Sequence, residues 1–387
     1  MKVAILTREF PPEVYGGAGV HVEYLSRELS KICDVEVYCF GQPRVSPLVQ
    51  AAFAPWDELP TGGAGAALQA MATDLRMASA VHGASVVHSH TWYANFGGHL
   101  AKLLYDVPHV MTSHSLEPLR PWKAEQLGGG YALSSFCERT AIEAADAVVA
   151  VSNDMAKDVL RCYPGVEEHR VAVIHNGIDT AEYRPDPETD VLERLGIDSE
   201  RPIVMWLGRV TAQKGIGHLL DMASLVASDA QLVFLAGAAD TVEIGEEMAA
   251  RAKALAQTRD DVFWLDGMLP RHEVVQVLSH ATVFVCPSLY EPFGLINVEA
   301  MACAAPVVAT AVGGIPEVVL DGVTGYLVEV PEDVALLGRE LADRVNALLD
   351  DLPLAAAMGE AGRERVARHF TWQAVAERTA ALYDSLL

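Results

Sequence analysis

The sequence has 387 residues, a length that predicts two domains. Of these residues 51% are hydrophobic and 21% charged, a composition typical of globular proteins. Its formal net charge of −24 opposes binding to nucleic acid and to anionic membranes, so neither is an expected partner. Six cysteines without a C-x-x-C pair, and no signal-like apolar run near Met1, predict a reduced, cytoplasmic protein.

The first part of the chain alternates short apolar runs with helix-length segments, which is typical of a parallel α/β sheet. The predicted strands are residues 2–6, 35–40, 86–90, 109–114, 147–151 and 171–175, with a helix over 20–32. Residues 41–65, rich in proline, glycine and alanine, predict a surface excursion. Gly16, Gly17 and Gly19 lack the G-x-G-x-x-G spacing, so a sugar or phosphate is favoured there over a nicotinamide cofactor.

A polar, proline-containing segment after Asp179 marks the expected domain boundary, and the strand–helix pattern then restarts. Strands are predicted at 203–207, 232–235, 262–265, 283–286 and 307–309, followed by helices only from 334 to 387. We therefore expect two doubly wound domains, 1–180 and 181–369, facing a central cleft at the carboxyl ends of both sheets. The oligomeric state stays open, and a homo-oligomer is compatible with the sequence.

The segment from Thr282 to Pro316 contains a strand, a turn with Glu291, and a predicted helix over 295–305 that carries Glu299. The first N–H groups of a helix have no partner within it, so they form a pocket for a phosphate. Here they belong to Gly294, Leu295 and Ile296. One glutamate can then face a sugar and the other a ribose, and the alternative is two solvated glutamates.

Two further motifs follow predicted strands. Arg209 and Lys214 lie at the start of the second domain's first helix, where both can face one diphosphate; the alternative is a solvated pair. His114 ends a strand of the first domain at the expected cleft, whereas His88 and His90 are interpreted as strand-end packing. No D-x-D pair and no His or Cys spacing of a zinc site occurs, so neither a metal nor another cofactor is expected.

Five motifs together resemble the retaining glycosyltransferases of the GT-B fold over nearly the whole chain. They are GGAG at Gly16, SHS at His114, HNGID at His175, GRVTAQKG at Arg209 and EPFGLINVE at Glu291. The opening TREFPPEVYGGAGVHVEYLSREL and the run SHSLEPLRPWK resemble the actinobacterial short-form glycogen synthases, which make α-maltose-1-phosphate from ADP-glucose and glucose-1-phosphate. The resemblance also implies that the last helix, 370–387, crosses back onto the first domain.

The resemblance implies a role for each matching residue. Arg209 and Lys214 would bind the diphosphate, Glu291 the glucose and Glu299 the ribose, while Gly16 and Gly17 would approach the sugar donor and His114 the reacting carbon. For the acceptor phosphate, the cations Arg120 and Lys123 are the candidates from the sequence, with a solvated basic loop as the alternative.

Three other functions stay open from the residues. The longer bacterial glycogen synthases carry Lys-x-Gly-Gly-Leu where this chain has Val14 to Ala18, so their lysine is missing here. Direct elongation of a glucan is therefore the second candidate function. A nucleotide-sugar epimerase or hydrolase of the same fold is the next alternative. A non-catalytic nucleotide-sugar binding module is disfavoured by the set of Arg209, Lys214 and Glu291.

Overall fold

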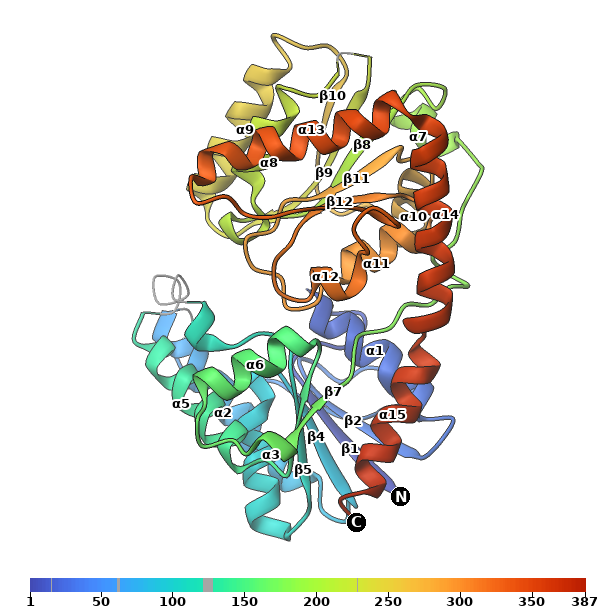
Figure 1. Ribbon diagram of the computed structural model, residues 1–387. Coiled ribbons are helices and arrows are strands. Elements are labelled where there is room, and N and C mark those ends of the chain that lie inside the picture. The colour runs from blue at the N-terminus through green and yellow to red at the C-terminus, as the bar shows by residue number, and fades with distance from the viewer. Residues whose placement is uncertain (15, 61–62, 121–127, 228) are drawn as a thin grey trace. The chain divides into compact units, whose positions relative to one another are not determined.

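The computed structural model describes residues 1–387 except 15, 61–62, 121–127 and 228 (Figure 1). Its contacts divide the chain into two compact units, Met1–Gly177 with Trp372–Leu387, and Ile178–Thr371. The last helix therefore belongs to the first unit. Among the helices of the described residues, none is both long and apolar enough to cross a membrane.

The first unit contains a seven-stranded parallel sheet in the order β3-β2-β1-β4-β5-β6-β7. Its strands are β1 (Lys2–Thr7), β2 (Asp34–Phe40), β3 (Val49–Phe53), β4 (Val86–His90), β5 (His109–Ser113), β6 (Ala147–Ala150) and β7 (Val171–Val173). The strand order reverses between β1 and β4, which is where ligands of doubly wound sheets bind.

Helices cover both faces of this sheet. They are α1 (Gly17–Leu29), α2 (Gly63–Ala80), α3 (Trp92–Tyr105), η1 (Glu117–Leu119), α5 (Gly130–Ala144), α6 (Asn153–Cys162), η2 (Glu168–Arg170) and α15 (Trp372–Asp384). Helices α1 and α15 lie side by side on one face (Figure 1), where the rings of Tyr24 and Trp372 stack with centroids 5.6 Å apart. Helices α2 and α3 pack on the other face. The C-terminal segment thus completes the first unit's core.

The second unit contains a six-stranded parallel sheet in the order β10-β9-β8-β11-β12-β13. Its strands are β8 (Ile203–Val210), β9 (Gln231–Ala239), β10 (Val262–Asp266), β11 (Val283–Cys286), β12 (Val307–Thr310) and β13 (Gly325–Val328). Here the order reverses between β8 and β11, so the unit repeats the topology of the first.

Helices again lie on both faces of the second sheet, with α8, α9 and α13 packed on one of them. The helices are α7 (Asp190–Leu195), η3 (Ala212–Lys214), α8 (Ile216–Ala223), α9 (Val242–Leu255), α10 (Arg271–Ser279), α11 (Leu295–Ala302), α12 (Ile315–Val318), η4 (Val334–Leu336), α13 (Leu337–Asp350) and α14 (Leu352–His369). The prediction that 334–387 is helical is confirmed.

Two strands were not predicted. The surface excursion expected at 41–65 contains strand β3 (Val49–Phe53), which pairs in parallel with β2 at the sheet's edge. Strand β13 (Gly325–Val328) closes the edge of the second sheet. Strand β3 contains Gln50 and has no buried residue, so it lacks the continuous buried apolar run that marks a central strand. Strand β13 is only four residues long and begins with Gly325, so its apolar run is short.

Candidate functional site

The second unit brings the two predicted motifs together where its strand order reverses. Arg209 and Lys214 lie at and just after the end of β8, and Glu291 lies in the loop after β11. Strands β8 and β11 are hydrogen-bonded neighbours, so the loops that follow them emerge at the same edge of the sheet. This is the position at which open α/β sheets bind ligands.

Backbone contacts hold these two loops against each other. The Leu289 N–H donates to the Gln213 carbonyl at 2.8 Å, and the Gln213 side-chain amide donates to the Tyr290 carbonyl at 3.1 Å. Gly215 has a φ of +66°, and a Cβ there would lie 1.8 Å from the Pro287 carbonyl oxygen. Only glycine fits this position, because the two loops meet backbone to backbone.

Lys214 and Glu291 form an ion pair within this junction. The Lys214 Nζ donates to Glu291 Oε2 at 2.5 Å, and the two side chains are only 27% and 10% exposed. Burial by itself lowers the pKa of Lys214, but the charge and hydrogen bond of Glu291, together with Cys286, raise that pKa above its ordinary value. The Ser288 hydroxyl also donates to Glu291 Oε2, at 3.3 Å. The alternative of a solvated pair is therefore wrong for Lys214.

Arg209 also has an acidic partner. Its Nη2 donates to Asp240 Oδ1 in a short hydrogen bond, with 38% of the Arg209 side chain exposed and 15% of Asp240. Sequence reasoning missed Asp240, although it directly follows strand β9 and so satisfies the same rule of position that identified Arg209. The pair holds the guanidinium at the carboxyl edge of the sheet.

Helix α11 begins beside Glu291, as predicted. Gly294 precedes the helix with a φ of +92°, and Leu295 and Ile296 form its first turn. Glu299 is only partly buried, yet burial raises its pKa to about 7 although a hydrogen bond from Tyr183 opposes that shift. Glu291 is buried and Glu299 is partly buried, so the two are not a pair of solvated glutamates.

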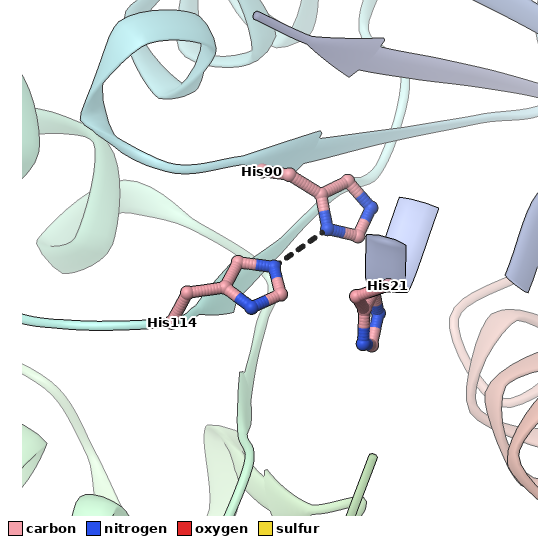
Figure 2. Close-up of side chains that lie close together, drawn as sticks. All are labelled: His21, His90 and His114. Atoms are coloured by element: carbon pink, nitrogen blue, oxygen red, sulfur yellow. Dashed lines mark hydrogen bonds between the residues drawn. The ribbon is translucent and has the colours of Figure 1, made fainter. Parts of the chain in front are cut away.

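In the first unit His114 is one of three neighbouring histidines. It follows β5, His90 ends β4 and His21 lies on α1, so all three surround the reversal between β1 and β4 (Figure 2). The His90 Nδ1 and His114 Nε2 lie 3.1 Å apart. Burial lowers the pKa of His114 well below its ordinary value, so its imidazole is neutral at neutral pH. The interpretation of His90 as packing alone missed this contact.

His88 behaves as expected from the sequence. Its ring is fully enclosed, with Nδ1 2.6 Å from the Tyr383 hydroxyl and Nε2 2.7 Å from the Thr112 hydroxyl. Both ring nitrogens are therefore satisfied within the core of the first unit. His88 thus links strand β4 to helix α15, and neither of its ring nitrogens is available to His21, His90 or His114.

The glycine loop and the predicted acceptor cations complete the first unit's candidate residues. A Cβ at Gly16 or Gly17 would meet nothing within 4 Å, so open space lies beside both glycines. The Gly16 N–H donates to Glu9 Oε2 at 2.9 Å. Arg120 donates to the Ser115 hydroxyl at 2.9 Å and lies 4.0 Å from the buried Glu117 carboxylate. The predicted acceptor residue Lys123 lies outside the described residues.

Two family models match the chain, one in each unit. The model for glycosyl transferases group 1 matches residues 188–365, and that for glycosyltransferase family 4 matches residues 15–182. Among solved structures, sucrose-phosphate synthase from Thermosynechococcus elongatus superimposes with a TM-score of 0.79 at 25% identity, covering 100% of this chain and 98% of that one. The expected fold class, GT-B, is confirmed.

Full-length relatives narrow the family further. The chain is 54% identical to alpha-maltose-1-phosphate synthase of Mycolicibacterium smegmatis, over 99% of both chains. It is 51% identical to the protein of that name from Mycobacterium tuberculosis, again over 99% of both. The chain therefore belongs to the nucleotide-sugar-dependent glycosyltransferases of the GT-B fold, in the family of the alpha-maltose-1-phosphate synthases.

Proposed function

We propose that this protein transfers glucose from ADP-glucose to α-glucose-1-phosphate, with retention at the anomeric carbon, to give α-maltose-1-phosphate for α-1,4-glucan synthesis. The observation that carries the choice of product is the identity of 51–54% to proteins named for that product, along almost the full length of each chain. The sugar donor and the stereochemistry rest on the resemblance of the motifs.

The second unit supplies groups suited to departure of a nucleoside diphosphate. Negative charge grows on the diphosphate as the glycosidic bond breaks, and Arg209, Lys214 and the first N–H groups of α11 can offset that charge. These groups are side chains and backbone, so the proposal requires no metal ion. Glu291 would accept hydrogen bonds from the glucose, and Glu299 from the ribose.

The first unit would contribute His114. Its neutral imidazole can donate a hydrogen bond from one ring nitrogen and accept one from a sugar hydroxyl at the other. The space beside Gly16 and Gly17 would admit the sugar donor close to the backbone. No carboxylate is assigned as a nucleophile beneath the anomeric carbon. We therefore propose a front-face route, in which the acceptor oxygen attacks the anomeric carbon from the same side as that from which the diphosphate departs.

A matrix of sugar donors and acceptors tests this proposal. Purified protein is given ADP-glucose or UDP-glucose, each with glucose-1-phosphate, with glycogen, or with no acceptor, and the products are separated and their anomeric configuration is determined. The expected result is α-maltose-1-phosphate from ADP-glucose and glucose-1-phosphate. A clear preference for glycogen would establish direct glucan elongation instead, and free glucose without an acceptor would establish a hydrolase.

A further inference from the structure

The three histidines of the first unit form a cluster of ring nitrogens at the end of the sheet. His21, His90 and His114 each offer one nitrogen, and these atoms all lie within 4.8 Å of one another. His21 and His90 are buried and His114 is partly buried. Figure 2 shows nitrogens of His90 and His114 facing each other, with His21 beside that pair. Their convergence from three separate elements needs an explanation.

The spacing of the rings matches that of imidazoles around one tetrahedral ion. Two nitrogens bound to zinc at about 2.0–2.1 Å lie about 3.3 Å apart, and their ring centroids about 5.2 Å apart. The His90 and His114 nitrogens are 3.1 Å apart. The three pairs of ring centroids are 4.7, 5.3 and 5.4 Å apart, which brackets the expected value. The three ligand atoms lie within 4.8 Å of one another, so the rings would close by up to about 1.5 Å to form a coordination shell.

The hydrogen bonds around the cluster leave a ring lone pair of His21 available. His21 Nδ1 lies 2.7 Å from the Asn176 side-chain oxygen, so Nδ1 carries the proton and Nε2 is a bare acceptor. The buried Nε2 of His21 has no hydrogen-bond partner among the described residues. His90 Nδ1 and His114 Nε2 share one hydrogen bond, which an ion bound between them would replace. A metal-bound histidine is typically held by such a bond from its other nitrogen to an oxygen. Asn176 therefore stands where an outer-shell residue would.

We propose that His21, His90 and His114 bind one divalent transition-metal ion, with Zn²⁺ or Co²⁺ as typical occupants. Three neutral imidazoles and no carboxylate suit these borderline ions and give little affinity for Mg²⁺ or Ca²⁺, which prefer oxygen ligands. Three protein ligands leave the fourth tetrahedral position to water or a ligand. The site does not rest on the proposed function, since it is argued from the cluster alone.

Cobalt gives a direct test, because tetrahedral Co²⁺ absorbs visible light far more strongly than octahedral Co²⁺. Full-length protein is stripped with EDTA, dialysed and titrated with Co²⁺, then with Zn²⁺. The expected result is an intense visible spectrum that saturates at one equivalent and disappears when Zn²⁺ displaces the cobalt. The absence of that spectrum, or a weak octahedral one, would overturn the proposal.

Variants assign the signal to the cluster. His21→Gln and His90→Gln should each abolish the tetrahedral spectrum, and Asn176→Ala should weaken Co²⁺ binding by roughly 10–100-fold, as loss of an outer-shell partner does. His82→Gln is the matched control, because His82 is an exposed histidine of the same unit and should leave the spectrum unchanged. Circular dichroism confirms folding of each variant. A tetrahedral spectrum that persists in both His21→Gln and His90→Gln would refute the assignment. If either histidine variant unfolds, Asn176→Ala provides the test instead, because it retains all three ligands and should still weaken Co²⁺ binding.

Discussion

The Lys214 ammonium donates to the Glu291 carboxylate at 2.5 Å although the two residues are 77 apart in sequence. Each residue follows a different strand, β8 or β11, and these strands become neighbours only in the folded sheet. The pair joins the two motifs of the second unit into one site. In that site a cation able to face a diphosphate is held by a carboxylate able to face a sugar.

Removing either partner of this pair should reduce catalysis. Lys214→Ala is expected to lower kcat about 100-fold, or about 3 kcal/mol, because the lysine is proposed to offset charge that develops on the leaving diphosphate. It should also destabilise the unit by roughly 1–3 kcal/mol, because a largely buried Glu291 loses its partner. Initial rates and urea unfolding measure both effects. A kcat close to that of the unmodified protein would contradict the assignment.

The stability effect of the Lys214–Glu291 pair can be separated from the effect of each single change. A double-mutant cycle with Lys214→Ala and Glu291→Ala should give a clear coupling free energy of unfolding. The matched control is the exposed pair Arg368 and Glu364 of the same unit, 2.8 Å apart with side chains 69% and 56% exposed. Its coupling should be at most about 1 kcal/mol. Equal couplings in the two cycles would show that burial adds nothing.

Arg209→Ala should also lower kcat by about two orders of magnitude, because it removes the second cation proposed to face the diphosphate. Its effect on stability should be smaller than that of Lys214→Ala, because the Arg209 side chain is 38% exposed and its partner Asp240 is 15% exposed, each more than in the Lys214–Glu291 pair. The control is Arg201→Ala, which removes an arginine of similar exposure, 35%, paired with Asp261 at 2.8 Å. Both variants are assayed at saturating sugar donor. Equal activities for the two variants would remove Arg209 from the proposed mechanism.

Glucosyl transfer should survive EDTA and gain nothing from added Mg²⁺, because in the proposed mechanism side chains and backbone amides stabilise the diphosphate. Zn²⁺ should inhibit it, because an ion on His114 occupies the nitrogen proposed to contact the sugar. Relative to each protein's own rate, His21→Gln should need at least about tenfold more Zn²⁺ for half-inhibition, and His82→Gln should match the unmodified protein. Loss of activity in EDTA that Mg²⁺ restores would reveal a required metal ion.

Arg120→Ala tests the acceptor side. If Arg120 binds the acceptor phosphate, the KM for glucose-1-phosphate should rise about tenfold or more while the KM for ADP-glucose stays unchanged. Because Arg120 also lies near buried Glu117, the double variant Arg120→Ala with Glu117→Gln removes the charge left behind. The same rise in KM in the single and double variants would support phosphate binding. An unchanged KM in the single variant would assign Arg120 a structural role.

Glu299 should make the second unit less stable as the pH rises. Burial raises its pKa from 4.5 to about 7, so the folded state retains a proton that the unfolded state releases. The contribution of this group to the free energy of unfolding is therefore most favourable below about pH 4.5. It falls by up to about 3 kcal/mol between about pH 4.5 and pH 7 and stays constant at higher pH. Glu299→Gln should remove this slope, and the exposed control Glu340→Gln should retain it. Urea unfolding between about pH 5 and pH 8 measures the difference.

Local patterns in the sequence were sufficient to predict the central strands and the positions of Arg209, Lys214, Glu291 and His114. A buried parallel strand is a continuous apolar run, and functional side chains follow its carboxyl end, so both signals lie within a few consecutive residues. The edge strand β3 is interrupted by Gln50 and the apolar run of β13 is only three residues long, so the assignment of both depends on pairing with a neighbour.

Tertiary structure alone decided which distant side chains meet. Asp240 reaches Arg209 only because β9 pairs with β8, and the two residues are 31 positions apart, too far for one short sequence motif to contain both. His21, His90 and His114 come from a helix and the ends of two strands, so a search for closely spaced ligands finds no zinc pattern among them. Their nitrogens converge because parallel strands all end at one edge of the sheet. That convergence depends on strand order, which local sequence does not encode.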